Sequence, residues 1–287
     1  MTNLIGALAL GSVYSLIAIG VVLVYRTTGL INFAQGELVA IGAYAYIFAC
    51  SWSGSPIITL GVAIIAGAAA GGIFFVVVHM LLRGREELRL VVGTIALLTL
   101  VQGGARLLAT DRPYRAPTWL FPDRTITFAG AVLPLNSLVI ITVLGVAVIA
   151  LFLWFSTTIA GKAMSAVAED PLRSALAGIP VRTMLLLSWT GAGALAAIAG
   201  VLISPITGVF PVMGAQLFLA AVVAAVIGGL DSVFGALIGG LIVGLIQTYA
   251  VIWVGGDLRD VVVFGLLLAF LLVRPSGLFG SGRLRRV

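Results

Sequence analysis

The chain has very little charge. Only 9% of its 287 residues are Asp, Glu, Lys or Arg, whereas a soluble globular domain carries about 25%. Apolar runs of about 20 residues recur along the whole length, and each is long enough to cross a bilayer as an α-helix. The short alternating segments of a transmembrane β-barrel are missing. The sequence therefore predicts an all-α, polytopic transmembrane bundle, with residues 1–287 in one transmembrane domain.

Cysteine and histidine are also scarce. Cys50 is the single cysteine, so no disulfide can form within the chain. His79 is the single histidine and has no Cys or His companion, so no metal site is expected. The net charge is +6, but the basic residues stand at the ends of apolar runs rather than in one patch. This placement argues against nucleic-acid binding.

Catalytic motifs are missing too. HExxH, GxSxG and CxxC do not occur. The nearest approach to a phosphate-binding loop is Gly161-Lys162. It has Ser156 where a P-loop has its first glycine, and Ala163 where the loop needs Ser or Thr. We therefore expect no enzyme activity and no bound cofactor, and any ATP would be bound and hydrolysed by a partner.

Nine apolar segments can be counted, which predicts about 8–10 membrane segments. They cover approximately residues 4–25, 37–50, 56–81, 91–109, 136–156, 184–203, 215–229, 233–253 and 261–273. The second, seventh and ninth are short for a full crossing, because a helix needs about 20 residues to span the hydrocarbon core.

The distribution of basic residues predicts the orientation. Cytoplasmic loops of membrane proteins carry an excess of Lys and Arg. Eleven of the 16 basic residues would lie on one face: Arg26, Arg83, Arg85, Arg89, Lys162, Arg173, Arg182, Arg274, Arg283, Arg285 and Arg286. The other face would receive Arg106, Arg112, Arg115, Arg124 and Arg259. The first face is predicted to be cytoplasmic, with the N-terminus outside and the C-terminus inside.

Two connections are long. Residues 110–135 are predicted to form an extracytoplasmic loop, with a β-prone stretch at 125–128 and a turn at Gly130. Residues 160–182 form a polar cytoplasmic loop. Asp170 is a suitable N-cap there, Pro171 suits the first helical position, and Gly178 suits a helix C-terminus. A short amphipathic helix at the membrane surface is therefore expected.

Glycines at four-residue spacing favour close helix packing in membranes. Gly235 and Gly239 form one pair, Gly240 and Gly244 another, and Gly67 and Gly71 a third. Polar residues inside the membrane are costly and often functional. The candidates are Asn32, Gln35, Glu37, Thr94, Thr99, Gln102, Arg106 and Gln247. Simpler roles remain open: Asn32 and Asp231 as caps, Glu37 at the inner interface, and Arg106 snorkelling outward.

Three blocks of sequence carry a family resemblance. The segment 11–20, GSVYSLIAIG, is followed by Gly29-Leu30-Ile31-Asn32-Phe33-Ala34-Gln35-Gly36-Glu37. Together they resemble the opening of bacterial branched-chain amino acid ABC transporter permeases, which usually read NFAHGE or NFAQGE. Residues 161–179 look like the cytoplasmic loop of that family, and residues 224–240 look like its glycine-rich penultimate helix.

The resemblance implies a fold similar to type II ABC importer permeases and an inner-membrane location. In length the chain resembles the shorter of two permeases that pair in such systems. The implied partners are a second permease subunit (identical or different), two ABC ATPases, an extracytoplasmic solute-binding protein and the membrane lipid. Branched-chain amino acids are the expected solutes. Urea, short amides and other small solutes remain alternatives, because the 110–135 loop, with Arg112, Arg115 and Arg124, departs from the family pattern.

Two sets of residues follow from this hypothesis. The 160–182 loop is expected to dock on the ATPase through Gly161, Lys162, Glu169, Asp170, Arg173 and Gly178. Asn32, Gln35, Thr99 and Gln102 are predicted to line the substrate path. An ion-coupled secondary transporter is the alternative. It is less favoured because Glu37, Arg106 and Asp231 stand near segment ends rather than in mid-helix, where coupling groups usually lie.

Overall fold

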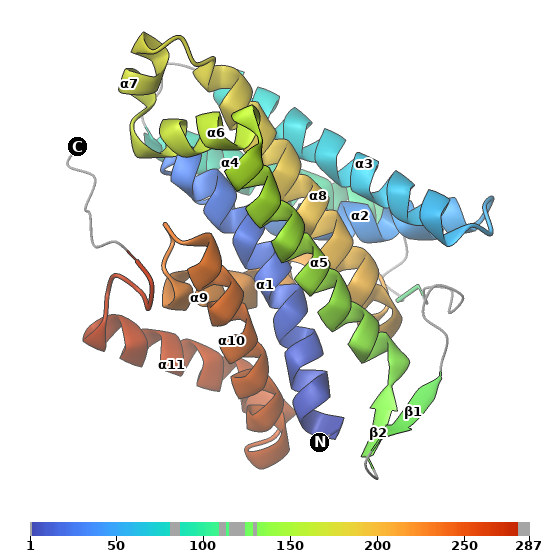
Figure 1. Ribbon diagram of the computed structural model, residues 1–287. Helices are drawn as coiled ribbons and strands as arrows, with labels where there is room; N and C mark the ends of the chain where they lie inside the picture. The colour runs from blue at the N-terminus through green and yellow to red at the C-terminus, as the bar shows by residue number, and fades with distance from the viewer. Residues whose placement is uncertain (1, 81–86, 109–112, 115–123, 129–130, 281–287) are drawn as a thin grey trace.

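The computed structural model describes residues 2–80, 87–108, 113–114, 124–128 and 131–280. Its main elements are α1 (Thr2–Thr28), α2 (Gln35–Cys50), α3 (Pro56–Phe75), α4 (Glu87–Leu108), β1 (Thr125–Phe128), β2 (Ala131–Pro134), α5 (Leu135–Thr157), α6 (Ile159–Glu169), α7 (Pro171–Leu176), α8 (Val181–Thr207), α9 (Met213–Gly228), α10 (Val233–Trp253) and α11 (Arg259–Val273) (Figure 1). A π-helical turn, Val76–Met80, extends α3, and a 3₁₀ turn, Gly256–Leu258, precedes α11. Of the predicted features, Arg83, Arg85, Arg112, Arg115, Gly130, Arg283, Arg285 and Arg286 lie outside the described residues.

Each of the nine predicted apolar segments is helical, which confirms the all-α bundle. Six helices are long and apolar enough to cross a membrane: α1, α3 with its π-helical turn, α4, α5, α8 and α10. The helices α2 and α9 have 16 residues each and α11 has 15. At a rise of 1.5 Å per residue they reach about 24 Å, less than the roughly 30 Å of a hydrocarbon core. The three segments predicted to be short are therefore the short helices.

Helix α1 forms the centre of the bundle. Every residue from 11 to 24 is buried. An all-round apolar sequence suits this position, because a helix without a polar face has to be covered on all sides. Helices α8, α9 and α10 pack around it, and α5 lies along its remaining side (Figure 1).

Glycines set the closest contacts of the core. A Cβ on Gly240 or Gly244 of α10 would overlap Ser15 or Gly11 of α1. Gly235 and Gly239, on a different face of α10, approach the backbone of α9 in the same way. The two glycine pairs therefore pack α10 against two different helices. The Ser15 hydroxyl uses the short α1–α10 separation to donate a hydrogen bond to the Leu237 carbonyl at 2.7 Å.

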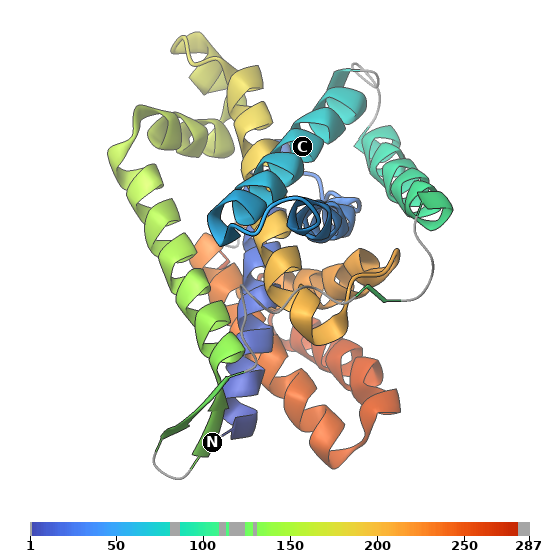
Figure 2. The same cartoon turned by 90° about the vertical axis from the view of Figure 1, so that its right-hand side faces the viewer.

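Two long helices stand at the edge of this core. Only 6% of the most apolar 18-residue window of α4 is buried and 11% of that of α5, against 89% for α1. Figure 2 shows α4 and α5 on opposite flanks of the bundle. Both helices are apolar enough to sit in a membrane, so their outer faces are suited to lipid or to another protein.

The molecule has two distinct ends. At one end the N-terminus meets a β-hairpin, where the Thr2 hydroxyl donates to the Val132 carbonyl at 3.0 Å (Figure 1). The hairpin pairs β1 with β2 antiparallel, so the β-prone stretch at 125–128 is a strand. At the other end α6 and α7 lie across the tops of the long helices (Figure 1). The β1–β2 pair of the 110–135 loop and the α6–α7 pair of the 160–182 loop are thus at opposite ends of the bundle.

Candidate functional site

The helical pair α6–α7 begins with a sharp corner after α5. The Thr158 side chain caps α6 by accepting a hydrogen bond from the Gly161 amide at 2.9 Å. A Cβ on Gly161 would overlap the Trp154 carbonyl, so this corner requires a glycine. The result is that α6 turns back against the bundle immediately after α5 ends.

Helix α6 has one buried face and one exposed face. Gly161, Met164 and Val167 recur every three residues and are buried against the bundle. Lys162 and Glu169 are exposed. A helix that is held by one apolar face and presents charges on the other can move with the bundle while a partner contacts its outer side.

Helix α7 is the capped helix predicted from the sequence. The Asp170 carboxylate accepts from the Arg173 amide at 3.0 Å, and Pro171 occupies the first turn. Gly178 has a φ of +80°, and the Ile179 amide donates to the Ser174 carbonyl at 3.0 Å, which completes a Schellman C-cap. The sequence prediction began the surface helix at Asp170 and did not include α6. The division falls at Asp170, whose extended backbone ends one helix while its side chain caps the next.

The outer surface of α7 carries two leucines that the sequence analysis did not single out. Leu172 is 71% exposed and Leu176 is 82% exposed. Their spacing of four residues places both on one side of the helix. Arg173 forms an ion pair with Asp170 at 3.0 Å, but both side chains are well exposed, so the pair adds little stability. Two leucines in an otherwise polar loop were the signal that could have identified this surface.

A second group of polar residues lies inside the bundle, where α2 begins. Asn32 and Gln35 are fully buried. The Asn32 carboxamide oxygen accepts from the Ala34 amide at 3.0 Å, and the Gln35 amide donates to the Ala192 carbonyl of α8 at 3.0 Å. The Gln35 side chain also lies beside Gly20 of α1. Both side chains therefore hold the α1–α2 connection against its neighbours.

Glu37 lies two residues after Gln35 and connects α2 to α4. Its side chain is fully buried, and its Oε1 accepts a hydrogen bond from Gln102 of α4 at 2.9 Å. Its Oε2 is buried and has no hydrogen-bond partner among the described residues. The sequence analysis considered Glu37 at the inner interface, but the structure buries it within the bundle. A buried carboxylate oxygen with unused acceptor capacity is suited to bind a cation or a hydrogen-bond donor.

Among the predicted path residues, Asn32 and Gln35 lie together: the Asn32 side-chain amide donates to the Gln35 carboxamide oxygen at 3.5 Å. Gln102 contacts the same helix through its hydrogen bond to Glu37. Thr99 is separate from this group. It is exposed on α4, and its hydroxyl donates to the Ile95 carbonyl of its own helix at 3.0 Å. Thr94 is nearer: its hydroxyl oxygen accepts from the Phe33 amide at 3.3 Å.

A bundle of long apolar helices, tightened by glycines and carrying a capped helical pair across one end, defines a polytopic membrane transport protein. The family model described as "Branched-chain amino acid transport system / permease component" matches residues 3–271. The chain therefore belongs to this family of permease components, whose members are transport subunits rather than enzymes.

Relatives and one solved structure agree with this assignment. The chain is 33% identical to the high-affinity branched-chain amino acid transport system permease protein BraD of Pseudomonas aeruginosa, over 100% of this chain and 98% of that protein. It is 32% identical to LivH of Salmonella typhimurium, a permease protein of the same kind, over 100% and 97%. It resembles the structure of PsaBC from Streptococcus pneumoniae with a TM-score of 0.51 at 15% identity, over 97% and 92% of the two chains. This last likeness concerns the fold alone.

Proposed function

We propose that this chain is the transmembrane permease of an ATP-driven importer for branched-chain amino acids. The observation that carries the proposal is the doubly capped α6–α7 pair, which presents exposed leucines and charges at one end of a membrane bundle of this family. The chain has no P-loop of its own, so two partner ATPases would bind the ATP. A second permease subunit and an extracytoplasmic solute-binding protein would complete the importer in the bacterial cytoplasmic membrane.

The α6–α7 end would face the cytoplasm and the ATPases. The predicted excess of basic residues on this side supports that orientation, with the N-terminus and the β-hairpin outside and the C-terminus inside. Leu172 and Leu176 would enter a groove of the ATPase. Lys162, Glu169, Asp170 and Arg173 would select the partner by charge complementarity. Gly161 and Gly178 fix the two turns that aim this surface.

The buried Glu37 gives the substrate path a chemical basis. A branched-chain amino acid carries an ammonium group, and the free Oε2 of Glu37 is an acceptor for such a cation. Gln102 would position the carboxylate, and Asn32 and Gln35 would hold the start of α2 in place. Because α4 packs loosely on the core, a movement of α4 would open the Glu37–Gln102 pair to the solute. Thr99, which faces away from this pair, stays a prediction.

Reconstitution tests the function. The chain would be assembled with its companion permease, ATPases and binding protein in liposomes, and ATP hydrolysis and uptake would be measured with leucine-loaded, urea-loaded and empty binding protein. We expect leucine to stimulate both activities. Stimulation by urea alone would keep the importer mechanism and change the solute. Uptake driven by an ion gradient without ATP would contradict the proposal and favour a secondary transporter.

A further inference from the structure

An apolar groove runs along the outside of α1, between α5 and α10. It encloses a cavity of about 270 Å³. Ile19 of α1 forms its floor, and residues such as Phe152 of α5 and Leu237 of α10 form its walls. In Figure 1, α1 lies between α5 and α10, and α6 lies across the ends of α5 and α1. The role proposed above for α6–α7 and for Glu37 uses no part of this groove.

The groove is open toward the surroundings of the bundle. Phe152 is 70% exposed and Phe234, on the opposite wall, is 58% exposed. The wall residues Val148, Leu151, Phe152 and Phe155 of α5 cover about two turns, or roughly 10 Å of helix. An apolar cavity of about 150 Å³ is already large enough to hold a benzene molecule. This groove can therefore accept a flexible hydrocarbon chain.

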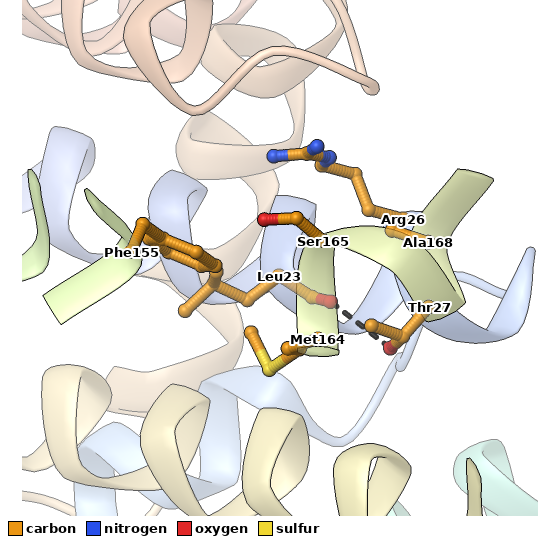
Figure 3. Close-up of a pocket in the computed structure, with 7 residues that line it drawn as sticks. All are labelled: Leu23, Arg26, Thr27, Phe155, Met164, Ser165 and Ala168. Carbon is orange, nitrogen blue, oxygen red and sulfur yellow. Dashed lines mark hydrogen bonds between the residues drawn. The ribbon is translucent and has the colours of Figure 1, made fainter. Parts of the chain in front are cut away.

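One end of the groove is polar. Arg26, two residues before the end of α1, is the one charged residue among the described residues that line it, and Ser165 of α6 lies next to it. Both residues also line a second, much smaller cavity of about 10 Å³ beneath α6. Figure 3 shows the Arg26 guanidinium and the Ser165 hydroxyl pointing in the same direction, on the same side of α6. The groove thus combines an apolar body with a cationic end.

The Arg26 guanidinium has hydrogen-bond donors to spare. Within the described part of the chain, neither a hydrogen bond nor an ion pair at bonding distance engages it. Asp231 and Glu169 attract the guanidinium through space without occupying its donors. A guanidinium offers two parallel N–H groups to a phosphate, and such charge-assisted pairs are strong.

We propose that this groove binds an anionic phospholipid, with its phosphate on Arg26 and an acyl chain along α1 between α5 and α10. A lipid provides the two chemistries that the groove requires, an anion at one end and a hydrocarbon along its length. A packed apolar helix would supply only the second. The groove ends at the α6–α7 side of the bundle, and basic pockets between membrane helices on the cytoplasmic side bind anionic head groups. The site does not depend on which solute is carried.

Native mass spectrometry of the purified full-length chain in detergent tests the site. The probes are phosphatidylglycerol and phosphatidylcholine with identical acyl chains, titrated separately. We expect one phosphatidylglycerol to bind more tightly than phosphatidylcholine. Arg26→Gln should weaken phosphatidylglycerol binding about tenfold, equivalent to about 1.4 kcal/mol. Arg274→Gln, which removes an exposed charge after α11, is the matched control and should leave the affinity unchanged.

A second variant tests the hydrocarbon part of the site. Val148→Trp fills the groove and keeps Arg26, so it should weaken both lipids while Arg26→Gln weakens mainly phosphatidylglycerol. Size-exclusion profiles identical to wild type would show that both variants fold. Equal binding of the two lipids, or no change in Arg26→Gln, would overturn the proposal. In the assembled importer, crosslinking from Val148→Cys to the companion permease in place of lipid would also overturn it, because the occupant would then be protein.

Discussion

Helices α1 and α5 are both apolar enough to cross a membrane, but they are packed very differently. Most of α1 is buried, whereas α5, which is the more apolar of the two, has few buried residues in the single chain. Hydropathy therefore places a helix in the membrane without saying what it touches. Glycine surroundings do show the contacts: Gly11 of α1 and Gly240 of α10 meet a neighbouring backbone, whereas Gly145 of α5 and Gly103 of α4 have open space around them. The molecule consists of a rigid core and an outer layer suited to lipid, partners and movement.

The largest expected effect comes from a side chain placed in the core. Gly240→Leu would force a leucine into Ser15 and the backbone of α1, where no side chain can move aside. Overpacking costs about 1–3 kcal/mol and occasionally more, and we expect the upper end of that range or loss of the folded protein. Thermal unfolding in detergent measures it. Gly145→Leu on α5 is the matched control, with a change within about 0.5 kcal/mol. Equal stability of the two variants would refute the division into core and outer layer.

A smaller effect is expected at the α6–α7 surface, and it concerns binding rather than stability. Leu172→Ala together with Leu176→Ala keeps the helix of α7 but removes its exposed apolar surface. We expect affinity for the ATPase to fall about ten- to a hundredfold, as for the central residues of an interface, with unchanged thermal stability. Pull-down or surface plasmon resonance with the ATPase measures this. Leu107→Ala, at an equally exposed leucine on α4, should have no effect. An unchanged affinity of the double variant would remove the leucines from the docking surface.

The next effect is expected where the core meets the outer layer. Glu37→Gln keeps the size of the side chain and a hydrogen bond to Gln102, but it removes the negative charge. We expect about a tenfold loss of amino acid uptake, because a charge-assisted hydrogen bond contributes roughly 1.5–3 kcal/mol. Uptake and ATP hydrolysis are measured together in proteoliposomes. Wild-type uptake would exclude Glu37 from the path. Thr99→Val in the same assay tests the remaining predicted path residue, and normal uptake would exclude it.

The sequence predicts the elements of this fold better than their contacts. The nine apolar segments and the caps at Asp170 and Gly178 could be identified because they depend on local signals. The burial of Glu37 could not, because it results from helices distant in sequence packing around α2, mainly α8 and α9, with α4 adding the Gln102 contact. Helix α6 was missed, because the prediction began the surface helix at Asp170, which in the structure ends α6 as well as capping α7. The groove at Arg26 could not be predicted either, because it forms only where α1, α5, α10 and α6 come together.

The most direct test of the account is a charge reversal on the coupling surface, Glu169→Arg with Arg173→Glu, in the reconstituted importer. ATP hydrolysis and amino acid uptake are measured in the same vesicles. The purified variant complex should have the same thermal stability as the wild-type complex. Both side chains are exposed, so the fold should tolerate the change. We predict that hydrolysis continues while uptake is lost, because the α6–α7 pair no longer transmits ATPase closure to the bundle. Normal uptake by this double variant would contradict the proposed coupling role.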